Sequence, residues 1–98
     1  MRLRFLSVLV TLLLAASPAL AQSANVLEGM KAQVREGVST YELDQLGRSL
    51  MVEEGATSAC YNYRVGSKRY PSYTCISVNE EVVHAIASLK RTLKRGDI

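Results

Sequence analysis

The fold depends above all on residues 60–76, CYNYRVGSKRYPSYTCI. Residues 60–65 and 72–76 are rich in aromatic and β-branched residues, which favour strands, and the run 66–71 between them favours a turn. If the turn is centred between Ser67 and Lys68, Cys60 and Cys75 face each other across the two strands. The sequence therefore predicts a β-hairpin closed by a disulfide between Cys60 and Cys75.

The two cysteines have other possible uses. A catalytic dithiol usually has C-x-x-C spacing, and a zinc site needs two further Cys or His ligands nearby; neither pattern is present. An intermolecular bridge is the main alternative to the intramolecular disulfide. We expect no metal and no cofactor.

The first 21 residues have the layout of a secretory signal peptide. Arg2 and Arg4 precede an apolar run over residues 5–16, and the small residues Ala19 and Ala21 mark a cleavage site before Gln22. The alternative is an uncleaved membrane anchor, although the apolar run is shorter than the roughly 20 residues of a typical span. We therefore predict a leader over residues 1–21 and one small disulfide-stapled domain over residues 22–98.

Removing that leader changes the charge and apolar content of the chain. The formal net charge falls from +3 to +1, because residues 22–98 hold 10 Lys and Arg against 9 Asp and Glu. This balance, together with export, argues against a nucleic-acid partner. Leu, Ile, Val and Phe make up 17 of the remaining 77 residues, which is marginal for a stable core and favours a covalent staple.

The rest of the chain favours helices. An apolar stripe within residues 24–36 predicts one, and a capping box at Ser39 and Glu42 predicts another from Thr40 to about Leu50, where residues 50–52 suit a buried strand equally well. A second capping box at residues 77–80 precedes an amphipathic C-terminal helix with the apolar stripe Val82, Val83, Ile86, Leu89 and Leu93. The predicted class is α+β, with an all-α fold containing a disulfide-tied loop as the alternative.

The residues offer little for catalysis. His84 is the only histidine, and on the predicted C-terminal helix it would face solvent, away from the apolar stripe. Both cysteines are assigned to the disulfide, and the chain has no Gly-x-Ser-x-Gly elbow or phosphate-binding loop. We therefore predict that the protein is not an enzyme.

The hairpin is the strongest candidate surface, because tyrosine and arginine are enriched where proteins bind one another. The candidate protein-binding residues are Tyr61, Tyr63, Arg64, Lys68, Arg69, Tyr70 and Tyr73. The alternative is that the tyrosines pack inward while the basic residues are solvated. A second basic group, Lys90, Arg91, Lys94 and Arg95, would lie at the end of the last predicted helix.

These features predict a periplasmic or secreted, non-enzymatic protein-interaction module, such as an accessory subunit or an inhibitor of another exported protein. The alternatives are a membrane-associated component held by an uncleaved N-terminal segment and a small secreted effector or toxin. The expected partner is another exported protein, with no nucleic acid, and with a membrane only if the leader is retained. The sequence leaves the oligomeric state open.

Overall fold

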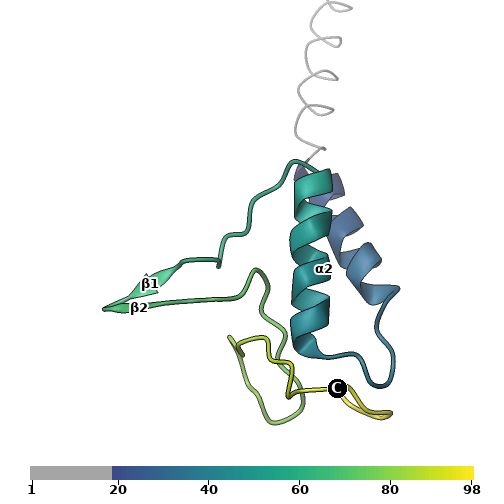
Figure 1. Cartoon of the computed structure of the whole chain (residues 1–98). Coiled ribbons are helices and arrows are strands. Elements are labelled where there is room, and N and C mark those ends of the chain that lie inside the picture. The colour runs from purple at the N-terminus through teal and green to yellow at the C-terminus, as the bar shows by residue number, and fades with distance from the viewer. Residues whose placement is uncertain (1–18) are drawn as a thin grey trace, which may run out of the picture.

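The computed structural model describes residues 19–98, which form two helices and one small sheet. The helices cover residues 19–31 and α2 (Thr40–Glu53), and the sheet pairs β1 (Arg64–Val65) with β2 (Lys68–Arg69). The helices lie side by side in opposite directions, and the hairpin projects to one side of them (Figure 1). The α+β class and its all-α alternative stay predictions.

The predicted leader, residues 1–21, falls mostly on residues 1–18, which lie outside the described residues. The helix of residues 19–31 continues without a break across the predicted cleavage position between Ala21 and Gln22. Within residues 19–98, no helix is both long enough and apolar enough to cross a membrane.

Helix α2 begins at the predicted capping box. The Glu42 amide donates to Ser39 Oγ at 3.0 Å, and the Ser39 amide donates to Glu42 Oε2 at 2.8 Å. These two bonds satisfy backbone donors that a helix start otherwise leaves free. The helix continues to Glu53, so residues 50–52 are helical rather than a strand.

Two glycines allow the helices to approach each other closely. A Cβ on Gly29 would lie 2.6 Å from Leu50 Cδ1, and a Cβ on Gly47 would lie 3.0 Å from both Met30 Sδ and Thr74 Cγ2. Glycine costs about 1 kcal/mol relative to alanine inside a helix. The close contacts explain why glycine is present at both positions despite that cost.

The predicted C-terminal amphipathic helix is wrong. Residues 77–98 form turns and extended coil with one isolated bridge between Ser39 and Thr92, and both Asn79 and His84 have φ of 55°. Most of the predicted apolar stripe is exposed to solvent, with Val82 88% and Leu89 67% exposed, and Leu93 is half-buried. A helix needs an apolar face packed against something, and nothing in residues 19–98 covers this one.

Side chains from elsewhere satisfy the backbone of this segment instead. Thr40 Oγ1 accepts from the Ser88 amide at 2.9 Å and donates to the Ser88 carbonyl at 3.2 Å. Ser72 Oγ accepts from the Ala87 amide at 3.0 Å. These bonds come from residues distant in the sequence, and they hold the Ala87 and Ser88 amides that a helix would otherwise bond internally.

The hairpin exists, but its register differs from the predicted one and the predicted disulfide is absent. Arg64 pairs with Arg69 around a Gly66–Ser67 turn, which moves the turn centre by one residue, and Cys60 and Cys75 are free thiols. Each residue of the first strand therefore pairs two positions earlier on the second strand than predicted, and in this register Cys75 is not the cross-strand partner of Cys60. The predicted second strand over residues 72–76 is also wrong, because this return segment is not paired with a strand.

A buried carboxylate holds that return segment against α2. Asp44, only 2% exposed, accepts from the Tyr73 amide at 3.1 Å, the Thr74 amide at 2.8 Å and Thr74 Oγ1 at 2.5 Å. Few apolar side chains are buried in the described part of the chain: Val26, Val38, Leu43 and Val78. Asp44 therefore connects α2 to the segment that follows the hairpin.

We predict that Gly47→Ala destabilises the protein. The new Cβ would press on Thr74, which cannot move away easily because Asp44 holds both its amide and its hydroxyl. Crowding of this kind costs about 1–3 kcal/mol and should outweigh the gain in helix propensity. Urea unfolding should show a lower midpoint, whereas Ser49→Ala on the exposed face of α2 should leave it unchanged or raise it.

We predict that Asp44→Asn lowers the free energy of unfolding by about 2 kcal/mol, because an amide nitrogen would then face a backbone donor. Denaturant unfolding measures the change. The control is Glu53→Gln, an isosteric change at an exposed position of the same helix. Equal stability of the two variants would show that the Asp44 bonds do not hold the return segment.

Candidate functional site

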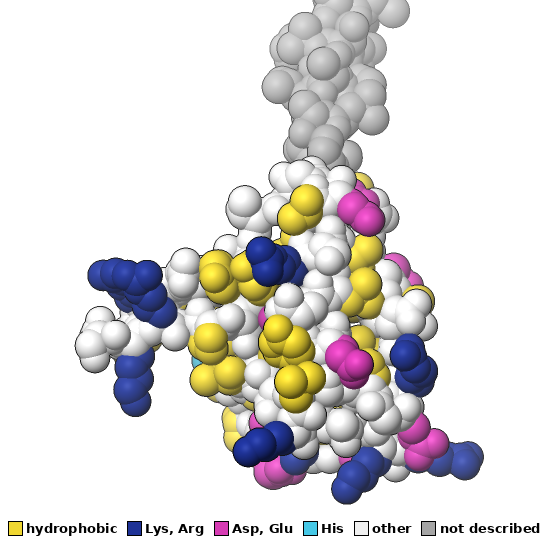
Figure 2. All heavy atoms as spheres, in the orientation of Figure 1, with side chains coloured by type: hydrophobic (Ala, Val, Ile, Leu, Met, Phe, Trp, Pro, Cys, Tyr) yellow, Lys and Arg dark blue, Asp and Glu magenta, His cyan; other side chains and the backbone are white. Residues whose placement is uncertain are grey.

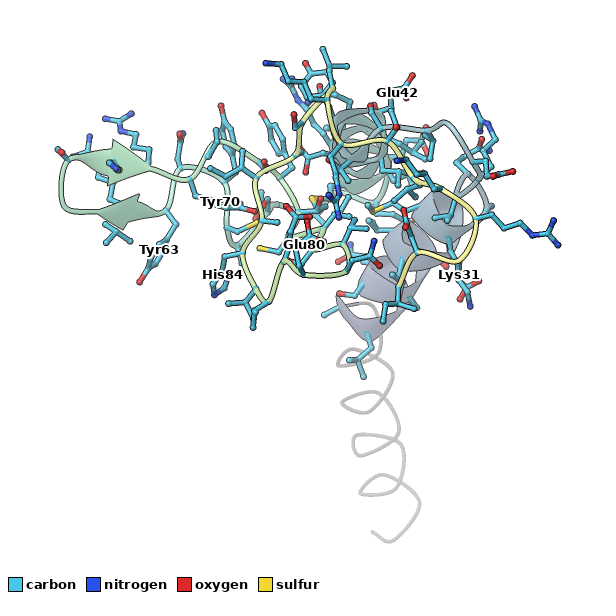
Figure 3. All side chains as sticks on the ribbon, turned by 90° about the horizontal axis from the view of Figure 1, so that it is seen from below. Lys31, Glu42, Tyr63, Tyr70, Glu80 and His84 are labelled. Atoms are coloured by element: carbon cyan, nitrogen blue, oxygen red, sulfur yellow. The ribbon has the colours of Figure 1, made fainter. Side chains whose placement is uncertain are left out.

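A largely apolar pocket of about 640 Å³ lies between the hairpin and the segment that follows Cys75. The residues that give it its chemistry are Cys60, Tyr63, Tyr70, Cys75, His84 and Ile86. Lys68 and Arg69 of the hairpin also contribute to its lining. Figure 3 shows Tyr63, Tyr70 and His84 on the hairpin side of the molecule. Apolar side chains gather between the hairpin base and α2 on the face in Figure 2.

Tyr70 fixes one wall of this pocket. Its hydroxyl donates to the Ala85 carbonyl at 2.6 Å and approaches the Thr74 carbonyl at 3.0 Å, which joins the two chain segments on either side of the pocket. Burial of the hydroxyl, with the Cys75 thiol beside it, raises the pKa of Tyr70 well above its usual value. Tyr70 is therefore a neutral donor at physiological pH.

The two thiols of the pocket lie in different surroundings. Cys60 Sγ donates to the Tyr73 carbonyl at 3.1 Å, and burial raises the pKa of the Cys60 thiol. Cys75 is exposed, and its Sγ lies 3.7 Å from His84 Nδ1. The pocket therefore contains one shielded thiol and one exposed thiol beside an imidazole.

The structure divides the predicted protein-binding residues into three groups. Tyr61 and Tyr73 stack with ring centroids 4.1 Å apart, and the Arg48 guanidinium lies 5.0 Å from the Tyr73 ring centre. Tyr63 and Tyr70 line the pocket. The third group is the basic residues of the two strands, of which Lys68 and Arg69 also line the pocket and Arg64 does not.

The sequence interpretation did not assign Cys60, Cys75, His84 or Ile86 to a binding pocket. It placed His84 and Ile86 on a helix and assigned Cys75 to a disulfide. No spacing pattern brings these residues together, because the coil that positions them is held by distant side chains such as Ser72 and Tyr70. Only similarity to known proteins could have singled them out.

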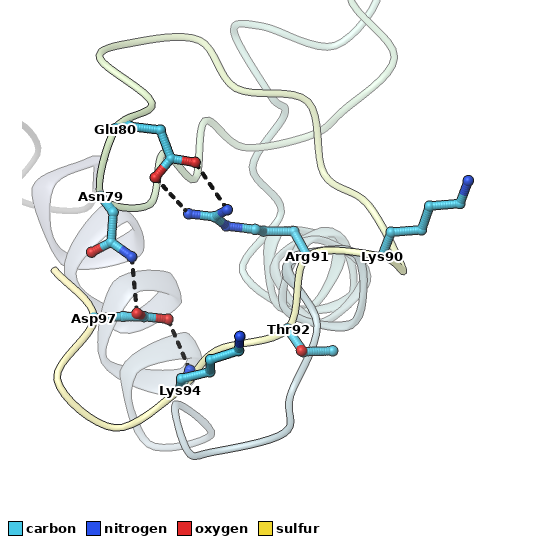
Figure 4. Close-up of a pocket in the computed structure, with 7 residues that line it drawn as sticks. All are labelled: Asn79, Glu80, Lys90, Arg91, Thr92, Lys94 and Asp97. Carbon is cyan, nitrogen blue, oxygen red and sulfur yellow. Dashed lines mark hydrogen bonds and ion pairs between the residues drawn. The ribbon is translucent and has the colours of Figure 1, made fainter.

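A second, smaller pocket is charged, and its groups are largely paired with one another (Figure 4). The Arg91 guanidinium donates to both carboxylate oxygens of Glu80, at 3.0 and 3.1 Å, and this ion pair lowers the pKa of Glu80. Asp97 accepts from Asn79 at 2.9 Å and from the Lys94 amide at 2.8 Å, and these bonds lower the pKa of Asp97. This pocket is best explained as a set of ties that hold the C-terminal segment.

Comparison with known proteins shows which family the chain belongs to. The model of metallopeptidase family M24 matches residues 17–98. The chain belongs to metallopeptidase family M24. Methionine aminopeptidase 2 of Bacillus subtilis is 44% identical over 73 residues, covering 72% of this chain and 27% of that protein. The methionine aminopeptidase of Escherichia coli is 44% identical over 77 residues, covering 78% and 28%. That of Aquifex aeolicus is 36% identical over 77 residues, covering 76% and 30%.

This M24 chain thus spans less than a third of the length of the curated relatives that it matches. The family name implies a metal, but the donor set of the described residues does not fit one. In residues 19–98, no three His, Cys, Asp or Glu side chains lie close enough together to hold a metal ion. No step of a reaction is therefore assigned to a metal held by these residues.

Family membership corrects the predicted function. The prediction of a non-enzymatic interaction module is wrong, as are its accessory-subunit, inhibitor, membrane-component and effector versions, because M24 is a family of metallopeptidases. The prediction of periplasmic or secreted localisation is wrong as well. That prediction depended on interpreting the chain as a small exported module with a disulfide. The matched relatives are methionine aminopeptidases instead. The family match also begins inside the predicted leader, at residue 17.

We predict that iodoacetamide at mildly alkaline pH modifies Cys75 several-fold faster than Cys60. Only the thiolate reacts, and burial both raises the pKa of Cys60 and shields its sulfur. Mass spectrometry of Cys60→Ser and Cys75→Ser, each with one thiol left, measures the two rates separately. Equal rates would contradict the shielding of Cys60.

Proposed function

We propose that this chain functions in the removal of an amino-terminal methionine from peptides, as part of an M24 methionine aminopeptidase. In this proposal the apolar pocket receives the methionine side chain. Family membership supports the peptidase chemistry, and the names of the similar proteins support the substrate. The single observation that carries the assignment to the pocket is its lining of aromatic, aliphatic and sulfur-containing side chains.

The pocket chemistry suits a thioether side chain. Methionine is flexible and polarisable, and its sulfur makes favourable contacts with aromatic rings such as those of Tyr63 and Tyr70. Ile86 adds an aliphatic surface, and the shielded Cys60 thiol adds a small uncharged one. The volume of about 640 Å³ lies within the roughly 300–1,000 Å³ usual for small-ligand sites.

His84 supplies the polar group at this pocket. Its side chain is exposed beside Cys75, and a neutral imidazole has one donor and one acceptor nitrogen. In the proposed complex it would hydrogen-bond the peptide main chain next to the methionine. His84 lies in coil with φ of 55° rather than in the predicted helix, and it lines the pocket.

A binding experiment on the full chain tests the pocket. The tripeptide Met-Ala-Ser should bind more tightly than Gly-Ala-Ser, and Ile86→Asp should weaken Met-Ala-Ser binding about tenfold by placing a carboxylate among apolar groups. Isothermal titration calorimetry measures both. Ile86 is 56% exposed, so the change should not unfold the protein.

The matched control is Leu89→Asp, which introduces the same charge at an exposed position of the same segment that does not line the pocket. This variant should bind Met-Ala-Ser within about twofold of the wild type. Equal affinity for the two tripeptides, or equal losses in the two variants, would reject the pocket as the methionine site.

A further inference from the structure

The β1–β2 hairpin places two like charges directly opposite each other. Arg64 of β1 is the cross-strand partner of Arg69 of β2. Cross-strand partners project from the same face of a sheet, with Cβ atoms about 4.5–5.5 Å apart, and like charges in that position destabilise the pair. The hairpin therefore has a local arrangement that its own folding does not favour.

No acidic group in the described part of the chain relieves this repulsion. Neither arginine takes part in a described salt bridge or side-chain hydrogen bond, and all four strand residues are exposed. In the sequence, no Asp or Glu occurs between Glu54 and Glu80. The basic side chains extend from the tip of the projecting hairpin, separate from the acidic side chains visible on the main body (Figure 2).

Apolar side chains and backbone groups accompany these charges. Tyr63 is 64% exposed and Val65 is 71% exposed, immediately on either side of Arg64. The sheet has only two strands among the described residues, so each strand has an outer edge without a pairing strand. A free edge can pair with an extended peptide, whose alternate side chains then meet the flanking residues.

We propose that this hairpin is a docking site for an acidic, extended peptide segment of a partner protein. A carboxylate of the partner lies between Arg64 and Arg69 and accepts hydrogen bonds from both guanidinium groups. Apolar side chains of the partner pack on Tyr63 and Val65. This surface adjoins the proposed methionine site and shares Tyr63, Val65 and Arg69 with its lining, whereas Arg64 does not line that pocket.

The charge distribution favours a protein over a nucleic acid. Residues 22–98 are almost neutral, with 10 basic against 9 acidic side chains, and residues 55–79 hold three of the basic side chains and none of the acidic ones. Three basic side chains neutralise only about three phosphates, too few for strong nucleic-acid binding near physiological salt. Exposed tyrosine and valine beside arginine provide the mixed contact that protein interfaces use.

Fluorescence anisotropy with the full chain tests this proposal. The probe is a short labelled peptide alternating Glu and Val; the comparison peptide has Gln in place of Glu. We expect the Glu peptide to bind more tightly, and the double variant Arg64→Gln/Arg69→Gln to weaken its binding by about tenfold or more. The affinity should also fall as salt rises.

The matched control removes two positive charges elsewhere, with Lys90→Gln/Arg95→Gln, and should change the affinity by less than about twofold. Thermal unfolding checks folding: the midpoint of the hairpin variant should stay unchanged or rise, because a like-charge pair has been removed. Equal losses in the two double variants, equal binding of the Gln peptide, or tighter binding of a labelled oligouridine than of the Glu peptide would overturn the proposal. These measurements involve no methionyl peptide, so their failure is separate from failure of the proposed function.

Discussion

The buried carboxylate of Asp44 is the interaction on which the rest of the structure depends. It lies on α2, yet its three bonded donors belong to the segment that returns from the hairpin. That segment leads directly to Cys75, and Ser72 within it binds the backbone of Ala87 next to Ile86. One carboxylate therefore determines where both walls of the pocket lie relative to the helices. With so few buried apolar residues in the described chain, polar bonds take over much of the positioning that a larger core would provide.

Local sequence signals predicted the parts of the fold whose stabilising contacts are local. The capping box at Ser39 and Glu42 involves residues only three apart, and it is present. The C-terminal segment has an equally clear pattern, but its backbone is held by Thr40, which lies 48 residues from Ser88. The apolar stripe that suggested a helix is mostly exposed instead. Periodicity cannot show whether a packing surface for a stripe exists, and here no such surface lies within the described residues.

Local sequence patterns also could not predict how the pocket is assembled. Sequence patterns identified the tyrosines and basic residues of the hairpin because they cluster within a few positions, but treated them as one surface. The structure instead divides them between a ring stack, a pocket and the projecting strands, and each strand residue pairs two positions earlier than predicted. The disulfide prediction failed for this reason too, because it fixed the register from the cysteines. The chain instead aligns Arg64 with Arg69 and leaves both thiols free.

The basic residues of the hairpin have a second possible role besides docking, which is protection of its strand edges. Charged residues on exposed strands discourage pairing between identical edges, and Lys68 by itself fits that role. Edge protection requires charge along the strand, however, and does not require two arginines to face each other at a cost in stability. An isolated two-stranded hairpin is already marginal in water, and a like-charge pair makes up one of the two cross-strand pairs here, which lowers its stability further. A carboxylate bound between the two guanidinium groups would convert that repulsion into attraction, which is why the pairing of Arg64 with Arg69 favours an acidic partner over simple protection of the edge.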